Sequence, residues 1–404
     1  MKIINPNYIY INDTILRNHA IAYKQSIHKI APLDDLKLLY PNAEIEHLNE
    51  NSLLMPGLIN AHVHIEFSAN KTHLSYGDFM TWLYSVIENR EELIGGCDAE
   101  CMSKATKSML KNGITTFGAI SSHGMDLEAC ANAAQNVVYF NELIGSQATM
   151  ADTLFTDFLS RLDASKSVKR EGFHPAVAIH SPYSVHPILI KKALDIVKNE
   201  NLKLTAHFME SQAERDWLDS SDGDFKKFFK DLLKQDNAVC DSKEFLNYFE
   251  NQETLFTHAV QANESELNTL AKDNHTVIHC PISNRLLGNP TLNIKELNER
   301  GIPWIVATDG LSSNYTLDLF EEMKLSLFMH PSAPLLKFAK SLIHGVTKGA
   351  AHALGLNTGE IKEGKNSDFI VLDLEKEPND ELAIHLILHR YNISSVYING
   401  KKEI

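Results

Sequence analysis

Two histidines, His62 and His64, close an apolar segment near the start of the chain. The segment begins at Pro56 and has the sequence PGLINAHVH, which predicts a buried strand. Side chains two residues apart on a strand point to the same side, so the two imidazoles converge on one point. Neutral imidazole nitrogens are ligands that zinc and iron accept. By itself the pair is also compatible with two core histidines, so the metal interpretation depends on partners elsewhere in the chain.

Three further apolar segments carry ionisable residues at their ends. The sequence LKLTAHFME places His207 at the end of a predicted strand, with Glu210 three residues on. The sequence TLFTHAV places His258 at the end of another, and PWIVATDG leads to Asp309. Packing does not explain this recurrence, because each unpaired buried polar group costs about 1–3 kcal/mol. A shared metal ion and a water molecule would satisfy these side chains together.

The same residues predict a hydrolytic reaction. A bound metal ion lowers the pKa of water toward about 7 and so supplies hydroxide near neutral pH. Asp309 and His258 can accept a proton and pass it on, and Glu210 can donate a proton to the substrate opposite the hydroxide. Displacement of an amino group from a purine-like ring requires such a donor. The arrangement therefore favours deamination over simple ester hydrolysis.

Short apolar segments alternate with longer helical segments from Pro56 to about Leu356. Eight of them are predicted strands: 56–64, 114–120, 137–144, 176–180, 202–207, 254–258, 275–279 and 303–309. Eight strands with intervening helices predict an α/β protein with a (β/α)8 barrel, whose active residues lie at the carboxyl ends of the strands. The fourth strand lacks the lysine whose carbamylated form bridges two metal ions in many hydrolases on this barrel. We therefore expect one divalent ion per subunit, zinc or iron.

The two ends of the chain differ from the middle. Residues 1–55 and 357–404 contain short alternating segments, predicted to be antiparallel strands of one small β-sandwich domain, which leaves 56–356 as the catalytic barrel. One connection, at about 211–249, is long and carries an amphipathic helical segment from Phe225. An insertion of this kind is typical of a lid or of a subunit contact in a homodimer. The alternative is a solvated charged helix without a role in the chemistry.

Composition excludes several classes of protein. The chain has 404 residues, 44% of them hydrophobic, and a formal net charge of -14, which argues against nucleic-acid or anionic-membrane partners. Its five cysteines lack CxxC spacing, so neither a disulfide framework nor a thiolate zinc finger is indicated. The sequence shows no signal-peptide pattern and no apolar run of roughly 18 residues. We expect a soluble cytoplasmic enzyme acting on a small molecule.

The order of the motifs is similar to that of a known family. The motifs are PGLINAHVH at 56–64, HFME at 207–210, HA at 258–259, HCPISN at 279–284 and TDGLSSN at 308–314. They resemble the amidohydrolase superfamily, in particular its branch of adenosine-type and chlorohydrolase-like deaminases, and the likeness extends to GEIKEGKNSD at 359–368. The resemblance implies that Glu210 donates a proton to purine N1 and that His258 is a proton shuttle. It implies four metal ligands: His62, His64, His207 and Asp309.

Two further residues match substrate-binding positions of methylthioadenosine and S-adenosylhomocysteine deaminases within this branch. Glu88, in WLYSVIENR, matches the carboxylate that grips the ribose diol, although an ordinary glutamate on a helix surface is the alternative. His180, in HSPY, matches the histidine that touches the purine, and its alternative is a satisfied histidine at a strand end. The resemblance therefore implies a nucleoside substrate with a 6-aminopurine.

One departure from that pattern narrows the range of expected substrates. S-adenosylhomocysteine deaminases clasp the amino-acid carboxylate with arginines around the third strand, and residues 137–149 contain neither Arg nor Lys. The chain most resembles the bacterial enzymes of menaquinone synthesis that convert 6-amino-6-deoxyfutalosine to futalosine and ammonia, and that also accept methylthioadenosine. That substrate ends in a benzoate, for which Arg285 is the candidate cation, unless it is an exposed loop arginine. Phe67, Trp82 and Phe208 are aromatic candidates, with core packing as the alternative.

Two other classes of function remain open on the sequence alone. A related hydrolase of a triazine, guanine, cytosine or acylated amine would keep the metal ligands without needing Glu88 or His180. A catalytically silent barrel that serves as a scaffold would need neither the ligands nor Glu210. The complete set of ligand types argues against the silent barrel.

Overall fold

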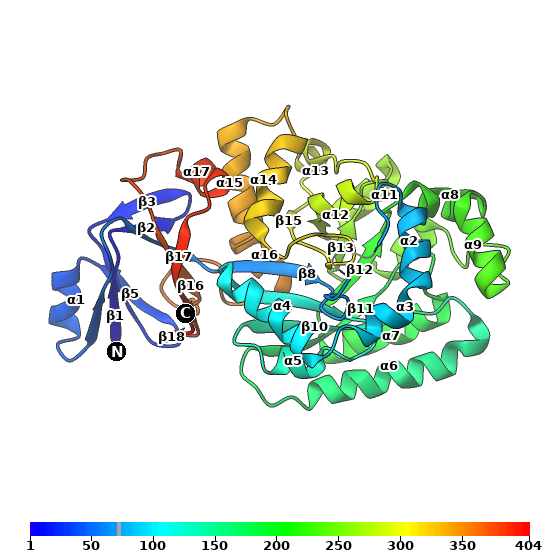
Figure 1. Ribbon diagram of the computed structural model, residues 1–404, viewed down its shortest axis with the longest axis horizontal. Coiled ribbons are helices and arrows are strands. Elements are labelled where there is room, and N and C mark those ends of the chain that lie inside the picture. Colours follow the sequence, from blue (N-terminus) through cyan, green and yellow to red (C-terminus); the bar gives the residue numbers. More distant parts are fainter. Residues whose placement is uncertain (71–73) are drawn as a thin grey trace.

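A computed structural model describes residues 1–70 and 74–404 of the chain. Figure 1 shows two lobes, a small β-rich lobe that contains both chain ends and a larger lobe in which helices surround strands. Within the described residues, every helix is too short or too polar to cross a membrane. The two lobes correspond to different segments of the chain, since the middle of the sequence builds the larger one.

The larger lobe is built on eight parallel strands that pair in the order of the chain. These strands are β8 (Leu58–Val63), β9 (Ile114–Ser121), β10 (Asn136–Leu143), β11 (Phe173–Ile179), β12 (Leu204–Phe208), β13 (Leu255–His258), β14 (Thr276–His279) and β15 (Trp304–Val306). Every residue of β8, β9 and β10 is buried, as expected of parallel strands covered on both faces. The predicted (β/α)8 barrel is confirmed.

The last strand meets the first through a side chain. Because β15 has only three residues, its ladder ends at Val306. Beyond it, the Asn60 amide donates to Thr308 Oγ1 at 2.7 Å and accepts from the Thr308 N–H at 3.1 Å. The Asp309 N–H then donates to the His62 carbonyl at 3.1 Å. The closure therefore brings Asp309 beside the end of β8.

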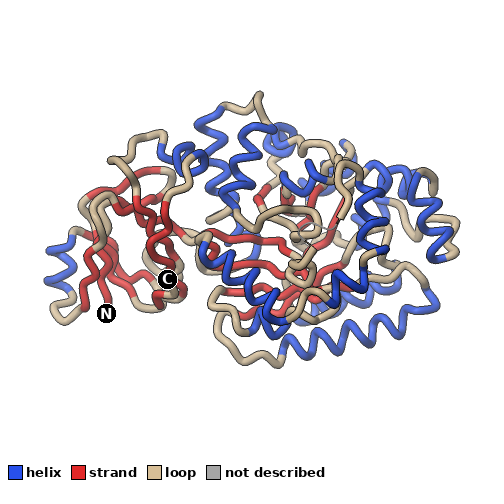
Figure 2. The backbone as a smooth tube through the Cα atoms, viewed as in Figure 1, coloured by secondary structure: helices blue, strands red, loops and turns tan. Residues whose placement is uncertain are grey.

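Helices surround this sheet on its outer side, as Figure 2 shows. They are α2 (Phe79–Glu88), α3 (Arg90–Gly95), α4 (Ala99–Lys111), α5 (Leu127–Ala131), α6 (Ala151–Lys166), α7 (Pro187–Glu200), α11 (Glu264–Lys272), α12 (Pro281–Leu286), α13 (Ile294–Arg300), α14 (Leu319–Met329), α15 (Leu335–Gly345) and α16 (Lys348–Leu354). Polar side chains fix where several of them begin. Asp78 accepts from the Thr81 N–H at the start of α2, and Asn263 and Glu266 form a capping box at the start of α11.

The long connection after β12 folds into three helices, α8 (Gln212–Ser220), α9 (Asp224–Leu233) and α10 (Ser242–Tyr248). The aromatic side of α9 is buried, whereas its lysines are exposed. The Phe225 ring lies 6.0 Å from that of Phe79 on α2, and the Phe229 ring stacks on Trp217 at 5.0 Å. On this face α9 packs against α2, the helix that carries Glu88, while its lysines face solvent. The role of the insertion as a lid or a subunit contact stays a prediction.

The small lobe contains two sheets with an apolar core between them. One has the order β5-β4-β1-β6 and the other β18-β17-β16-β7-β2-β3. The elements of this lobe are β1 (Lys2–Asn5), β2 (Tyr8–Ile11), β3 (Thr14–Arg17), β4 (Ala20–Tyr23), β5 (Ile27–Ala31), α1 (Leu33–Leu39), β6 (Glu44–His47), β7 (Ser52–Pro56), β16 (Phe369–Asp373), β17 (Asn392–Ile398) and β18 (Lys401–Lys402). Between β16 and β17, α17 (Leu382–Leu388) packs against α14 and α15 of the larger lobe. The Tyr23 ring of the first sheet packs on Phe369 and Tyr397 of the second. The expected β-sandwich built from both chain ends is present.

The pairing inside this sandwich differs from the sequence expectation in one respect. We expected antiparallel strands throughout, but β1 pairs in parallel with β6, and β2 pairs in parallel with β7. The reason is that α1 and the segments around it return the chain to the starting edge, so that β6 runs in the same direction as β1. Strand alternation in the sequence carries no information on this direction.

Candidate active site

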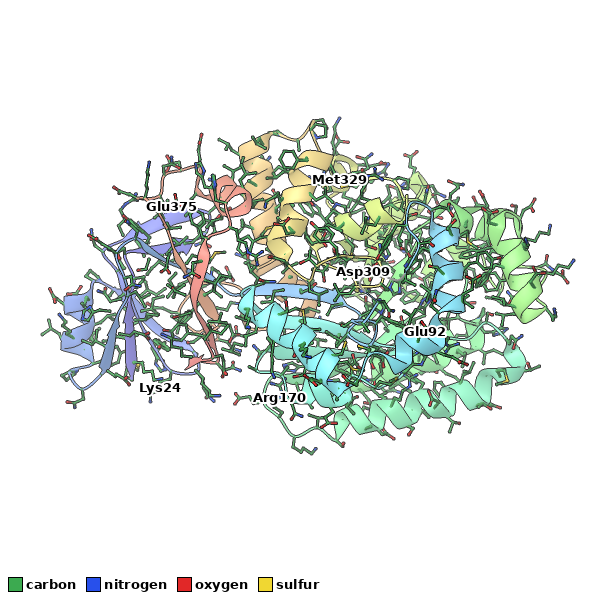
Figure 3. The ribbon with its side chains drawn as sticks, viewed as in Figure 1. Lys24, Glu92, Arg170, Asp309, Met329 and Glu375 are labelled. Carbon is green, nitrogen blue, oxygen red and sulfur yellow. The ribbon has the colours of Figure 1, made fainter. Side chains whose placement is uncertain are left out.

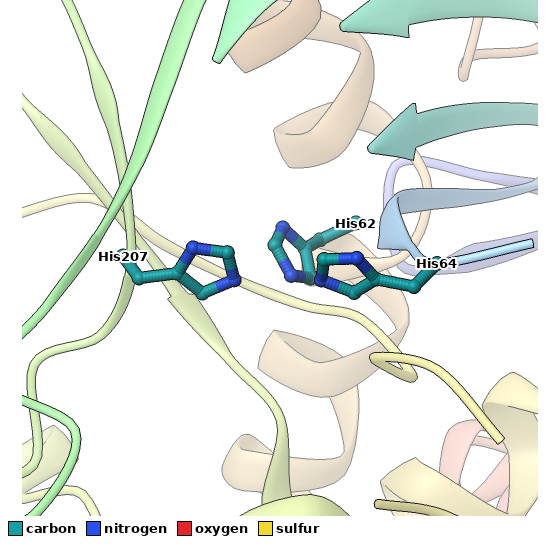
Figure 4. Close-up of side chains that lie close together, drawn as sticks. All are labelled: His62, His64 and His207. Atoms are coloured by element: carbon teal, nitrogen blue, oxygen red, sulfur yellow. The ribbon is translucent and has the colours of Figure 1, made fainter. Parts of the chain in front are cut away.

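Three histidines from two strands meet at the carboxyl end of the barrel. His62 and His64 lie at the end of β8, and His207 lies in β12 on the far side of the ring of strands. One nitrogen of each ring lies within 4.8 Å of the other two. Figure 4 shows these nitrogens pointing into the space between the rings. The buried Nε2 of His62 has no hydrogen-bond partner among the described residues, which leaves it available to a ligand.

Asp309, which is labelled in Figure 3, reaches the same place from the loop after β15. Its Oδ1 lies 3.6 Å from Nε2 of His64 and 3.8 Å from Nε2 of His62. Its backbone is left-handed, with φ of 59°, and a Cβ on the following Gly310 would lie 2.9 Å from that of His64. Burial opposes the charge of Asp309, but His64 and His62 outweigh it and lower the pKa to about 2.

Partners behind the rings fix the two buried histidines. Nδ1 of His207 donates to the backbone carbonyl of His180 at 3.0 Å, and Nδ1 of His62 lies 3.2 Å from Oγ1 of Thr257. Both contacts leave Nε2 directed to the centre of the cluster. Burial lowers the pKa of both rings well below the usual value, so both are neutral. Neutral imidazoles and one ionised carboxylate are a donor set that fits a divalent ion.

Glu210 and His258 form a second pair next to this cluster. Glu210 follows β12, and its Oε1 lies 3.6 Å from Nε2 of His258 at the end of β13. Nδ1 of His258 donates to Oδ1 of Asn284 at 2.9 Å. Burial, with smaller contributions from the charges of Asp309 and Glu214, raises the pKa of Glu210 well above its usual value. Burial also lowers the pKa of His258, so the pair is a protonated acid beside a neutral base.

Glu214 is a residue that the sequence analysis missed. Its buried carboxylate accepts from the backbone N–H groups of Met209 at 3.0 Å and Glu210 at 2.8 Å. Met209 has a φ of 51°, a left-handed backbone conformation that residues other than glycine rarely adopt. Glu214 therefore fixes the turn that presents Glu210. The spacing S-x-x-E of Ser211 and Glu214, a helix-start signal, could have identified it.

The predicted substrate-binding residues fall into two groups. His180 follows β11, with its ring centroid 5.0 Å from that of His207, and its Nδ1 lies 2.6 Å from the Ser184 hydroxyl. Glu88 is the last residue of α2 and is exposed. Arg285 is also exposed, on the short helix α12, immediately after Asn284. The structure thus brings His180 to the cluster and leaves Glu88 and Arg285 on the surface.

The three aromatic candidates also differ in position. Phe208 is fully buried and packs on Phe245 and Phe256, so it belongs to the core rather than to the substrate site. Nε1 of Trp82 donates to the backbone carbonyl of Ser312, in the loop that carries Asp309. Phe67 is half-buried, with its ring 6.4 Å from that of His64. The Phe67 ring therefore lies beside the histidine cluster.

Comparison with known proteins places this arrangement in a family. Residues 53–402 match the pattern described as the amidohydrolase family. The chain belongs to the amidohydrolase family. This amidohydrolase is 49% identical over 406 residues to an aminodeoxyfutalosine deaminase of Nitratiruptor sp., with 100% of both chains covered. The predicted family is therefore confirmed along the whole chain.

Solved structures agree with this assignment. Aminofutalosine deaminase of Helicobacter pylori, in complex with methylthio-coformycin, superposes on this amidohydrolase with a TM-score of 0.94 at 31% identity, covering 100% of both chains. An adenosine deaminase from Xanthomonas campestris with bound zinc has a TM-score of 0.83 at 21% identity, covering 100% of this chain and 92% of the other. The second comparison concerns the fold alone, which two deaminases thus share with this chain.

Proposed function

We propose that this amidohydrolase is a metal-dependent hydrolytic deaminase that converts 6-amino-6-deoxyfutalosine to futalosine and ammonia, a step of menaquinone synthesis. The observation that carries the proposal is the 49% identity, over the full length of both chains, to an aminodeoxyfutalosine deaminase. The buried acid–base pair of Glu210 and His258 beside the histidine cluster supports hydrolytic deamination as the chemistry.

Four residues would hold one divalent ion in this proposal: His62, His64, His207 and Asp309. Zinc is the proposed ion, supported by its presence in the Xanthomonas deaminase, and iron(II) is the alternative for the same donor set. When bound, such an ion activates water as a nucleophile near neutral pH. Burial lowers the pKa of His62 and His207, and the nearby histidines lower the pKa of Asp309, so these three side chains favour the forms that bind a metal ion.

The remaining chemistry belongs to side chains. Glu210 is protonated because it is buried, so it can donate its proton to N1 of the purine as the water oxygen attacks the neighbouring carbon. His258 can take the proton of the attacking water, with Asp309 beside it, because its Nε2 has a free lone pair while Nδ1 donates to Asn284. His258 then passes this proton to the amino group, the C–N bond breaks and ammonia leaves, while the second proton of the water replaces the one that Glu210 gave to N1. Burial shifts the pKa of each group toward the protonation state that this step requires.

The substrate's other parts are assigned to the remaining predicted residues. His180 contacts the purine, Glu88 binds the ribose diol, and Arg285 binds the benzoate. The position of His180 beside His207 supports its proposed contact with the purine. Glu88 and Arg285 are exposed, and their roles rest on the resemblance to related deaminases. We assign catalysis to residues 56–356, and residues 1–55 and 357–404 form the small domain. We expect a cytoplasmic homodimer. Residues 211–249 would then form a lid over the site or part of the subunit contact.

A panel of 6-aminopurine nucleosides tests this function. The enzyme loaded with zinc is assayed for ammonia release and for the blue shift of the purine absorbance, with aminodeoxyfutalosine, methylthioadenosine, adenosine and S-adenosylhomocysteine side by side. We expect the highest kcat/KM with aminodeoxyfutalosine and the lowest with S-adenosylhomocysteine. Methylthioadenosine is the second candidate substrate, supported by the methylthio-coformycin complex of the Helicobacter enzyme. Turnover of a triazine or of guanine in place of all four nucleosides would overturn the proposal.

A further inference from the structure

A buried carboxylate that the proposed reaction does not use lies behind the histidine cluster. Glu142 is near the end of β10, the strand next to the one that leads to His180, and none of it is exposed. Its Oε2 accepts from the Ser122 hydroxyl at 2.5 Å. Its Oε1 is buried without a hydrogen-bond partner among the described residues. Because such an oxygen is costly to leave without a donor, its surroundings indicate what it does.

Oε1 of Glu142 faces the back of a proposed metal ligand. It lies 3.8 Å from Nδ1 of His207, the nitrogen on the side of the ring away from His62 and His64. One oxygen of Glu142 and one nitrogen each of His180 and His207 lie within 4.8 Å of one another. Nδ1 of His207 already donates to the backbone carbonyl of His180. Glu142 therefore places a carboxylate oxygen beside this N–H, at a distance too long for a hydrogen bond.

This geometry excludes a second cation site formed by Glu142, His180 and His207. A nitrogen that donates its proton to a carbonyl has no lone pair for a metal, so His207 cannot contribute Nδ1. The carboxylate has a different effect on the ring. A negative charge near Nδ1–H holds the proton on that nitrogen and makes Nε2 a stronger donor to a metal on the other side.

We infer that Glu142 is a positioning residue, which acts through His207 by fixing its proton on Nδ1 and strengthening the bond of its Nε2 to the metal ion. The inference rests on the metal site of the proposed function. It extends that site by one residue on a strand that supplies none of the predicted ligands. It also explains why β10 carries a buried carboxylate, Glu142, close to the histidine cluster.

Zinc release tests the inference without reference to turnover. Purified zinc-loaded enzyme is mixed with excess chelator, and zinc transfer is followed with a colorimetric indicator. We expect E142Q to lose zinc about 10- to 100-fold faster than the wild type. E266Q is the matched control, because Glu266 is also buried but pairs with Arg215 on the outside of the barrel. That control should lower the thermal stability and leave the release rate unchanged.

Each outcome decides between the inference and its alternatives. A release rate of E142Q within twofold of the wild type would overturn the role of Glu142 and leave the metal site intact. Two zinc ions per wild-type chain would overturn it in favour of a second cation site. A wild type that retains no zinc would remove the proposed metal site and this inference with it. If E142Q does not fold, E142D replaces it, since the shorter side chain withdraws the charge, and unchanged release from E142D is then the contrary result.

Discussion

Oε1 of Glu210 and Nε2 of His258 face each other at 3.6 Å, from the ends of two adjacent strands of the barrel. Burial acts on both groups in opposite senses, since it raises the pKa of the carboxyl and lowers the pKa of the imidazole. The result is a proton donor and a proton acceptor that are both uncharged next to the histidine cluster. A hydrolytic deamination needs this pair of states at the same time.

The first prediction concerns the proton donor. We expect E210Q to retain one metal ion per chain, because Glu210 is not among the proposed ligands, and to lose turnover by about 10²- to 10⁴-fold, because glutamine cannot supply the proton. Metal content by inductively coupled plasma mass spectrometry and ammonia release measure the two effects. E264Q, at an exposed position on α11, is the control and should match the wild type. Full activity of E210Q would contradict the mechanism.

The second prediction concerns the metal. Replacing His207 with alanine removes one of the three converging nitrogens, so H207A should lose both the metal ion and turnover. The matched control is H28A, an exposed histidine on β5 in the small lobe, which should keep both. Metal content and ammonia release are measured after identical loading with zinc. If H207A bound zinc as tightly as the wild type, the ligand set would be wrong.

The third prediction separates a nucleoside deaminase from a hydrolase of smaller rings. If Glu88 binds the ribose diol, E88A loses charged hydrogen bonds, and KM for a nucleoside should rise about tenfold or more. The KM for the same base without ribose should not change. E91A, an exposed glutamate on the neighbouring helix α3, is the control. An unchanged KM of E88A for every nucleoside would favour the triazine or guanine hydrolases.

The sequence was sufficient to predict the residues whose positions follow from local geometry. The side chains of His62 and His64 converge because they are two apart on a strand, and His207 and His258 meet them because parallel strands end at one edge of a barrel. Asp309 was predicted in the same way, although β15 ends three residues earlier and Asn60 completes the closure.

Residues whose role depends on contacts across the fold were not predictable. Glu142 lies in a strand of buried residues without a motif, and only the structure shows that its oxygen faces His207. The burial of Phe225 and Phe228 could be expected from their helical spacing, but their packing against Phe79 and Tyr84 of α2 could not. The parallel pairing of β1 with β6 likewise depends on where a connection returns, which strand alternation does not determine.

The last prediction concerns stability and pH, through a carboxyl group away from the proposed metal ligands. Asp126 follows β9 and is fully buried, with Oδ1 accepting from the Ser121 hydroxyl at 2.6 Å and the Tyr139 hydroxyl at 2.7 Å. Burial first, and the charge of Glu66 second, raise its pKa from 3.8 to about 7. In the pH range between these two values, the folded chain holds a proton that the unfolded chain has lost.

This difference in bound protons makes the folded state less stable as the pH rises. The stabilising contribution of protonated Asp126 is complete below about pH 4 and is lost as pH rises to about 7, at up to roughly 1.4 kcal/mol per pH unit. D126N keeps the acceptor oxygen and removes the charge. We therefore expect the Tm of D126N relative to the wild type to be higher at pH 8 than at pH 5, as measured by circular dichroism. D195N, at an exposed position on α7, should show no such trend, and an equal shift for D126N at both pH values would mean that Asp126 is charged throughout.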